Sequence, residues 1–139
     1  IRIPRTVLSD KGLENLRNIV QAKESLIRKA LGINDLTIRS DENSVIFPWT
    51  CENTELQTVE AVRTFVTKLC ATAEKSQRMS SKEKEVENEK YAFRCFLLRL
   101  GFIGNEYKSS RTVLLKNFTG SSSFKSGFRK TERPQKTSA

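Results

Sequence analysis

A nearly unbroken apolar run, residues 91–103, constrains the fold of this chain more than any other stretch. Ten of its thirteen residues are apolar, and the two arginines that interrupt it, Arg94 and Arg99, lie about 140° apart on a helical wheel. Such a run leaves no polar face, so it predicts a buried helix. The helix should end at Gly101, because glycine adopts the left-handed conformation of a helix stop without a Cβ clash.

A second helix is expected after a short turn, over residues 105–118, because asparagine at position 105 is a favourable residue for capping a helix start. Apolar residues at a spacing of three to four form one face of this helix, namely Tyr107, Leu114 and Phe118. The other side is positively charged and polar, and carries Lys108, Thr112 and Lys116 with Arg111 at its border. Residues 90–118 therefore predict a helix-turn-helix-like pair with one basic side.

Positive charge is concentrated in the C-terminal third of the chain. The formal net charge is +9; residues 1–90 contain 15 Lys and Arg against 14 Asp and Glu, whereas residues 91–139 contain 10 against 2. Residues 120–139 hold too few apolar side chains to fold alone and predict a flexible basic tail. This asymmetry favours a nucleic acid or an acidic protein surface as the partner over a membrane. The candidate binding residues are Lys108, Arg111, Lys116, Lys125, Arg129 and Lys130.

The preceding part of the chain predicts, together with this pair, a single α+β domain over residues 1–119. An apolar-polar alternation that meets Pro4 is typical of a short edge strand. Ser9 and Gly32 are suited to start and stop one amphipathic helix over residues 9–31. Two β-prone runs, 36–39 and 44–47, flank turn-forming residues and predict a hairpin.

A further amphipathic helix should begin at Asn53 or Thr54 and continue to about Arg78. The resulting β-α-β-β-α order predicts a small sheet with helices on one face, onto which the 91–103 helix also docks. Residues 80–90 have no apolar period and alternate their charges, so they are expected to form a solvated linker or an exposed lead-in to the next helix.

The residue types present argue against catalysis. The chain contains no histidine, which excludes His-assisted nucleophiles and most zinc sites. The four glutamates between positions 83 and 89 lie two residues apart, so on a helix they cannot converge on a metal. An SxxK-like and a phosphate-loop-like run in residues 120–126 lack the flanking elements that such motifs need and are interpreted as loop. We therefore expect no enzymatic activity, no metal and no cofactor.

Three cysteines, Cys51, Cys70 and Cys95, are odd in number and lack CxxC spacing. We interpret them as reduced residues of a cytoplasmic protein. No run approaches the length of a membrane span. The sequence leaves the oligomeric state open, with a homodimer as one alternative.

As a DNA-reading helix-turn-helix, the 90–118 pair departs from the usual pattern at two positions. Leu97 stands where a small residue normally lets the two helices cross closely, and Ser110 stands where an apolar contact is expected. Specific DNA recognition is therefore the second interpretation rather than the first.

Two stretches, KYAFRCFLLRLGFIGNEYK at residues 90–108 and SFKSG at residues 123–127, carry a resemblance. They resemble the C-terminal signature of small "virulence-related" proteins of conjugative elements in Gram-positive gut bacteria, and the likeness extends to ALGINDL at 30–36 and FPW at 47–49. The resemblance implies a mobile genetic element, on which small non-enzymatic proteins counter host defence, including anti-CRISPR inhibitors of Cas9. A Cas9–guide RNA complex is then the expected partner, and the alternative is a DNA-binding regulator of the element itself.

Overall fold

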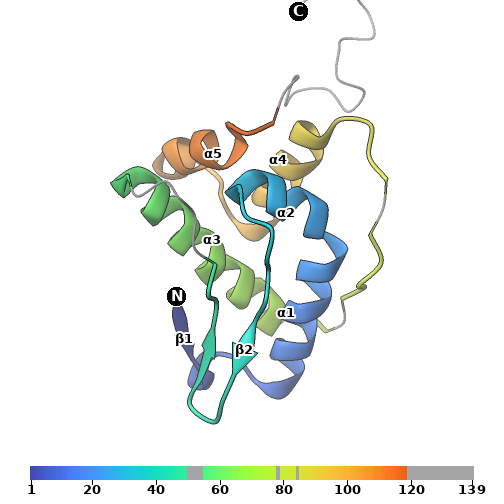
Figure 1. Cartoon of the computed structure of the whole chain (residues 1–139), viewed down its shortest axis with the longest axis vertical. Coiled ribbons are helices and arrows are strands. Elements are labelled where there is room, and N and C mark those ends of the chain that lie inside the picture. Colours follow the sequence, from blue (N-terminus) through green and yellow to red (C-terminus); the bar gives the residue numbers. More distant parts are fainter. Residues whose placement is uncertain (50–54, 78, 84, 119–139) are drawn as a thin grey trace, which may run out of the picture.

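Helix α3, Leu56–Lys75, is the element against which helices α1, α4 and α5 all pack. In the computed structural model, which describes residues 1–49, 55–77, 79–83 and 85–118, α3 crosses the middle of the molecule (Figure 1). Asn53 and Thr54, which we expected to start this helix, lie outside the described residues, and α3 begins at Leu56 with Glu55 as its N-cap residue. Its core face is formed by Ala61, Val62, Phe65, Val66, Leu69, Cys70 and Ala73, all buried.

The first long helix is divided in two at Lys23, so the prediction of one helix over residues 9–31 is wrong. Helix α1 spans Asp10–Ala22 and α2 spans Glu24–Leu31, and between them Lys23 has φ −115° and ψ 18°. A straight helix would place position 23 on the core face between Val20 and Ile27, and a lysine there would bury its charge. The bend keeps both apolar faces toward the core.

Both predicted ends of this helical segment are confirmed. The Ser9 hydroxyl accepts a hydrogen bond from the backbone N–H of Gly12 at 3.1 Å, as an N-cap residue does. Gly32 follows α2 with φ 69°, in the left-handed region that favours glycine. Local capping chemistry therefore fixes where the segment starts and stops, and the bend lies between these two points.

The sheet is antiparallel and consists of three very short strands: β1 (Arg2–Pro4), β2 (Arg39–Ser40) and β3 (Ser44–Ile46). Strand β3 is central, so β1 is an edge strand as predicted, and Ile3 and Ser40 both pair with Val45. The hairpin is confirmed but is shorter than predicted, because the carbonyl of Thr37 accepts a hydrogen bond from the Trp49 indole at 2.9 Å instead of a strand partner.

Helix α4, Glu89–Leu100, stops at Gly101 with φ 105°, as predicted. It is not buried on all sides, which corrects the expectation from its composition. The residues that face the core are Phe93, Phe96, Leu97 and Leu100, whereas Arg99 is exposed and the other side chains from Glu89 to Leu98 are half-buried. Helix α4 packs on α3 and on α5, not mainly on the sheet as we expected, because its apolar stripe meets the aromatic side of α3.

The segment predicted as one helix over residues 105–118 has two parts. A 3-10 turn, η2, spans Asn105–Tyr107, and helix α5 spans only Lys108–Leu115. Asn105 forms no side-chain capping bond, so the predicted cap is wrong. The ring of Tyr107 packs edge-on against Phe102, with 5.6 Å between ring centroids, and this contact ties the turn to the end of α4.

The described residues therefore form an α+β fold with five α-helices and one small antiparallel sheet. Its core includes an aromatic cluster that joins α3, α4 and the residues after α5, namely Phe65, Phe93, Phe96 and Phe118. The β2–β3 hairpin and α5 lie at opposite ends of the molecule in Figure 1. No helix in the described ranges is long and apolar enough to cross a membrane.

Candidate functional site

Three of the six predicted binding residues lie at α5, and Lys125, Arg129 and Lys130 lie outside the described residues. Lys108 is the first residue of α5 and Lys116 directly follows its last turn, and both are exposed. They are eight positions apart, which on a helix is about 12 Å along the axis and about 80° around it. Neither ammonium group has an ion pair or hydrogen bond with another described residue, so both are available to a partner.

Arg111 has a different environment from the two lysines. It is half-buried, and its Nη1 donates hydrogen bonds to the carbonyl oxygens of Phe102 at 2.9 Å and Gly104 at 3.0 Å. These two carbonyls belong to the turn between α4 and α5. The structure therefore brings Lys108 and Lys116 to the surface and directs Arg111 toward the backbone.

The surface of α5 carries hydroxyl groups beside its positive charge. Ser109 and Thr112 are exposed between the two lysines, and the sequence from 108 to 118 contains no acidic residue. The salt bridges among the described residues lie elsewhere and join Arg5 with Asp10, Glu24 with Arg28, and Lys29 with Glu89. We define the α5 surface as Lys108, Ser109, Thr112 and Lys116.

Asn117 fixes the end of this surface relative to α2. Its Nδ2 donates hydrogen bonds to the backbone carbonyl oxygens of Lys29 at 3.1 Å and Ala30 at 3.0 Å. These carbonyls lie in the last turn of α2, where they have no partner within the helix. The contact holds Lys116 beside the C-terminal end of α2.

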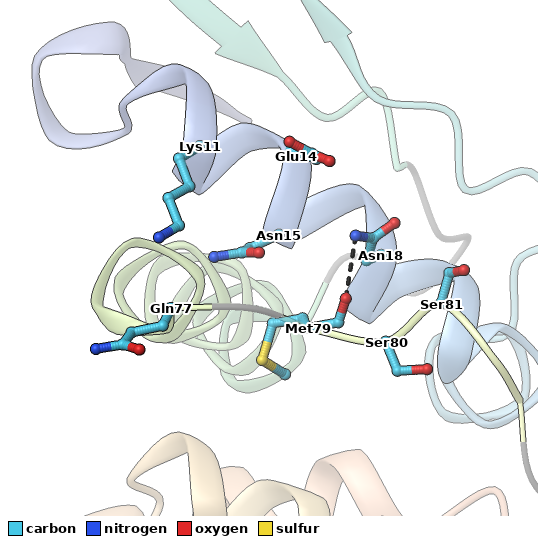
Figure 2. Close-up of a pocket in the computed structure, with 8 residues that line it drawn as sticks. All are labelled: Lys11, Glu14, Asn15, Asn18, Gln77, Met79, Ser80 and Ser81. Atoms are coloured by element: carbon cyan, nitrogen blue, oxygen red, sulfur yellow. Dashed lines mark hydrogen bonds between the residues drawn. The ribbon is translucent and has the colours of Figure 1, made fainter.

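A polar pocket of about 600 Å³ lies between α1 and the segment of Gln77 and residues 79–81 (Figure 2). Its amides hold the chain that follows α3 against α1: Asn18 Nδ2 donates to the carbonyl of Met79 at 3.1 Å, the dashed line in Figure 2. Asn15, only 4% exposed, donates to the carbonyls of Ala73 at 3.1 Å and Ser76 at 2.9 Å. Sequence reasoning missed this pair, although two asparagines three residues apart on one helix were a signal.

The cysteines differ in their surroundings. Cys70 is buried in α3, and burial raises its pKa to about 12, so its thiol stays protonated at neutral pH. Cys95 is half-buried and lies beside Tyr91, and a hydrogen bond with Cys95 raises the pKa of the Tyr91 phenol. Cys51 lies outside the described residues. Within the described ranges, no three His, Cys, Asp or Glu side chains gather in a way that would hold a metal ion.

Comparisons of the chain with protein-family models, with curated proteins and with solved structures give no match. The resemblance to virulence-related proteins of conjugative elements therefore stays an expectation from the sequence signature. What the chain binds has to be inferred from its own residues, and the α5 surface is the strongest candidate among those described.

Proposed function

We propose that the chain is a non-enzymatic binding protein whose α5 surface engages a nucleic acid or a ribonucleoprotein. The observation that carries this proposal is the pair Lys108 and Lys116, both exposed and unpaired among the described residues, on a helix without acidic side chains. A nucleic-acid strand presents one phosphate about every 3.4 Å of helix axis in duplex DNA. Two lysines about 12 Å apart along a helix therefore reach two separate phosphates.

The charge distribution of the whole chain supports the same proposal. Residues 91–139 carry 10 Lys and Arg against 2 Asp and Glu, so the field of the C-terminal third attracts a polyanion before any contact forms. Lys125, Arg129 and Lys130 follow α5 in the sequence and extend the proposed contact. Arg111 remains a candidate only through the nitrogens that do not bond to the Phe102 and Gly104 carbonyls.

The resemblance of residues 90–108 to proteins of conjugative elements favours one ribonucleoprotein from this class. It implies a mobile-element setting, in which small non-enzymatic proteins counter host defence such as CRISPR. We therefore propose a Cas9–guide RNA complex as the partner and inhibition of Cas9 as the outcome. The α5 surface would contact phosphates of the guide or of the target DNA, as the positively charged channels of such complexes do.

The alternative is a DNA-binding regulator of the chain's own element. The observation in its favour is the order of α4, a short turn at Gly104 and α5, which is that of a helix-turn-helix-like pair. Against it stand the length of α5, eight residues, and the position of Leu97, which is fully buried at the contact of α4 with the core. A recognition helix needs several side chains free to reach base edges.

Binding and cleavage assays with charge-reversed variants test both proposals. We expect Lys108→Glu combined with Lys116→Glu to weaken binding to duplex DNA or to Cas9–guide RNA for every sequence alike. The slope of log affinity against log salt should fall by about 0.9 for each phosphate that the variant no longer binds. The matched control is Lys11→Glu with Lys75→Glu, which makes the same change in net charge at two exposed residues away from α5.

The two functions differ in sequence preference. An inhibitor of Cas9 should suppress target cleavage and show little preference among duplexes. A regulator should prefer its own promoter to random duplex by about 10³ or more. Wild-type behaviour of the Lys108→Glu/Lys116→Glu variant in both assays would refute the role of the α5 surface.

A further inference from the structure

The outer side of α4 carries apolar residues that do not contribute to the core. The four residues of α4 that face the core are Phe93, Phe96, Leu97 and Leu100. On a helical wheel, Tyr91, Cys95 and Leu98 lie about 180° from the mean direction of these four. All three are half-buried, and none is among the described side chains that form the core or pack against it. We define the α4 stripe as Tyr91, Cys95 and Leu98.

The composition of α4 is that of a helix covered on all sides. Ten of the thirteen residues at 91–103 are apolar, and a helix that is apolar all round is normally buried. The polar atoms of the stripe are paired within it, because the Tyr91 phenol and the Cys95 thiol form a hydrogen bond with each other. The spacing of the three residues, four and then three, is the one by which helices pack against each other. The α4 stripe is therefore typical of a surface that another helix covers.

Arginines flank the stripe on both sides. Arg94 lies about 70° around the helix to one side of it and Arg99 about 70° to the other. The salt bridges among the described residues include neither arginine. The acidic residue of α4, Glu89, lies on the opposite side of the helix and pairs with Lys29 of α2. The sequence from 90 to 105 contains no acidic residue, so the stripe is an apolar strip between two positive edges.

The charge of these edges distinguishes among the possible occupants of the stripe. Residues 119–139 contain five Lys and Arg against one Glu, so Arg94 and Arg99 would repel this part of the same chain. A two-fold pairing with a second copy would place the Arg94 side chains of both copies next to each other, which is also repulsive. A partner with acidic residues beside an apolar face complements both edges and the stripe.

We propose that the α4 stripe docks an amphipathic helix of a partner protein, with aspartate or glutamate on both sides of its apolar face. Its apolar side chains lie on Tyr91 and Leu98, and its carboxylates pair with Arg94 and Arg99. Helix α4 has 12 residues and is about 18 Å long, which suits one docked helix. A whole subunit interface buries about 800 Å² on each partner. This inference is independent of the function proposed for α5, which involves another helix and another class of partner.

A fluorescently labelled synthetic peptide of about 20 residues is the probe, with leucines at a spacing of three to four and glutamates at the flanking positions. Fluorescence anisotropy should rise along a saturable curve as the full chain is added. In one control peptide the same residues are reordered so that the leucines share no face, and in the other lysine replaces each glutamate. Both should bind at least about tenfold more weakly, because the first cannot bury its leucines together and the second repels the two arginines.

A substitution within the stripe identifies where the peptide binds. Leu98→Glu places a charge in the apolar contact and should weaken binding of the acidic peptide at least about tenfold. Leu56→Glu, at an exposed leucine of α3, is the matched control and should bind as the wild type does. Both variants should fold, because neither leucine belongs to the core. If Leu98→Glu alone dissociates a dimer in sedimentation equilibrium, or alone loses binding to duplex DNA, the occupant is a second copy or a nucleic acid and the proposal is wrong.

Charge reversal at the two edges tests the complementarity. Arg94→Glu combined with Arg99→Glu should weaken binding of the acidic peptide at least about tenfold. Lys11→Glu combined with Lys75→Glu makes the same change in net charge away from α4 and should have a much smaller effect. The proposal is also wrong if the acidic peptide does not bind, if either control peptide binds as tightly, or if Leu98→Glu and the Arg94→Glu/Arg99→Glu variant bind the acidic peptide as the wild type does.

Discussion

The guanidinium group of Arg111 donates a hydrogen bond from Nη1 to the carbonyl oxygen of Gly104, 3.0 Å away and seven residues earlier in the chain. The same nitrogen donates to the carbonyl of Phe102 at 2.9 Å. The Gly104 carbonyl also accepts a hydrogen bond from the backbone N–H of Tyr107 at 3.3 Å, so a side chain from α5 adds to the backbone bonds of the turn between α4 and α5. An arginine that the sequence suggested as a phosphate ligand is thus part of the scaffold that holds the two helices together.

We expect Arg111→Gln to lower the free energy of unfolding by about 1–2 kcal/mol, because the partly buried bond to the Phe102 carbonyl and the exposed bond to the Gly104 carbonyl lose their charged donor. The control is Lys108→Gln, which removes an exposed side chain without a described partner and should change stability by less than about 0.5 kcal/mol. Urea denaturation measures both. Equal stability of the two variants would mean that the Arg111 hydrogen bonds contribute nothing.

Gly101 supplies a second prediction at the same turn. Its φ of 105° lies in the region that side chains with a Cβ rarely adopt. Gly101→Val should therefore cost about 1–3 kcal/mol in unfolding free energy. Ser109→Val, at an exposed helical position of α5, introduces the same side chain without the strain and should be nearly neutral. If Gly101→Val lowers the free energy of unfolding no more than Ser109→Val does, valine is not strained at position 101.

Sequence reasoning succeeded where the cause is local. Ser9, Gly32 and Gly101 were predicted as helix ends because capping depends on a few neighbouring atoms, and all three act as such in the structure. It failed at Lys23 and at η2. There the conformation depends on packing: a lysine cannot occupy the core face of a straight helix, and Tyr107 turns toward Phe102.

In the candidate site, too, the features with a local cause could be predicted and those that depend on tertiary packing could not. Exposure of Lys108 and Lys116 follows from their spacing against the apolar residues of the helix, and the structure agrees with that spacing. The bonds of Arg111 to Phe102 and Gly104 could not be predicted, because they depend on the path of the turn. That the described residues of the core cover only one side of α4 could not be predicted either, because its composition is apolar on all sides and tertiary packing decides which side meets the core.

We expect the protein to lose stability in acid because of a carboxylate in the turn of the β2–β3 hairpin. The carboxylate of Asp41 accepts hydrogen bonds from the backbone N–H groups of Asn43 and Ser44, both at 2.8 Å, and these bonds lower the pKa of Asp41 below its usual value. Because the folded state favours the ionised form, the contribution of Asp41 is complete above the unfolded pKa of about 3.9. It is lost as the pH falls through the lower pKa of the folded state.

Thermal unfolding measured from pH 5 downwards, to about pH 2, checks this. The melting temperature of the wild type should fall as the pH is lowered below about 4. The melting temperature of Asp41→Asn should fall less, because this variant lacks the carboxylate that titrates. Glu42→Gln removes the neighbouring carboxylate, which makes no hydrogen bond with a described residue, and serves as the control. An acid decline in Asp41→Asn as steep as in the wild type would show that the turn bonds do not couple to folding.

The last prediction concerns Gly12 and Glu74, which are 62 positions apart in the sequence and meet where α1 crosses the end of α3. A Cβ on Gly12 would lie 2.1 Å from Oε1 of Glu74. That oxygen accepts hydrogen bonds from the backbone N–H of Ser9 at 2.8 Å and from the Ser9 hydroxyl at 3.0 Å. Alanine at position 12 must therefore displace the carboxylate from Ser9.

Two opposing terms decide the effect of Gly12→Ala. In a helix, alanine is more favourable than glycine by about 0.8–1.0 kcal/mol. Against this, the substitution breaks the hydrogen bonds to Ser9 and crowds Leu8, whose Cδ1 would be 3.0 Å from the new Cβ. Together these two effects cost about 2 kcal/mol. We expect Gly12→Ala to destabilise the wild type by about 1 kcal/mol. In a Glu74→Ala background the carboxylate is absent, and the same substitution should cost at least about 1 kcal/mol less.

A double-mutant cycle in urea measures this coupling directly. The control cycle pairs Gly12→Ala with Glu14→Ala, which removes an exposed carboxylate of α1 that has no described hydrogen bond. Those two changes should add within about 0.5 kcal/mol. If the Gly12–Glu74 cycle is also additive within that margin, Glu74 relaxes without cost and its bonds to Ser9 do not hold the start of α1 against α3. A coupling of about 1 kcal/mol or more would establish that they do, and that glycine is required at position 12 by the approach of a carboxylate rather than by its own backbone angles.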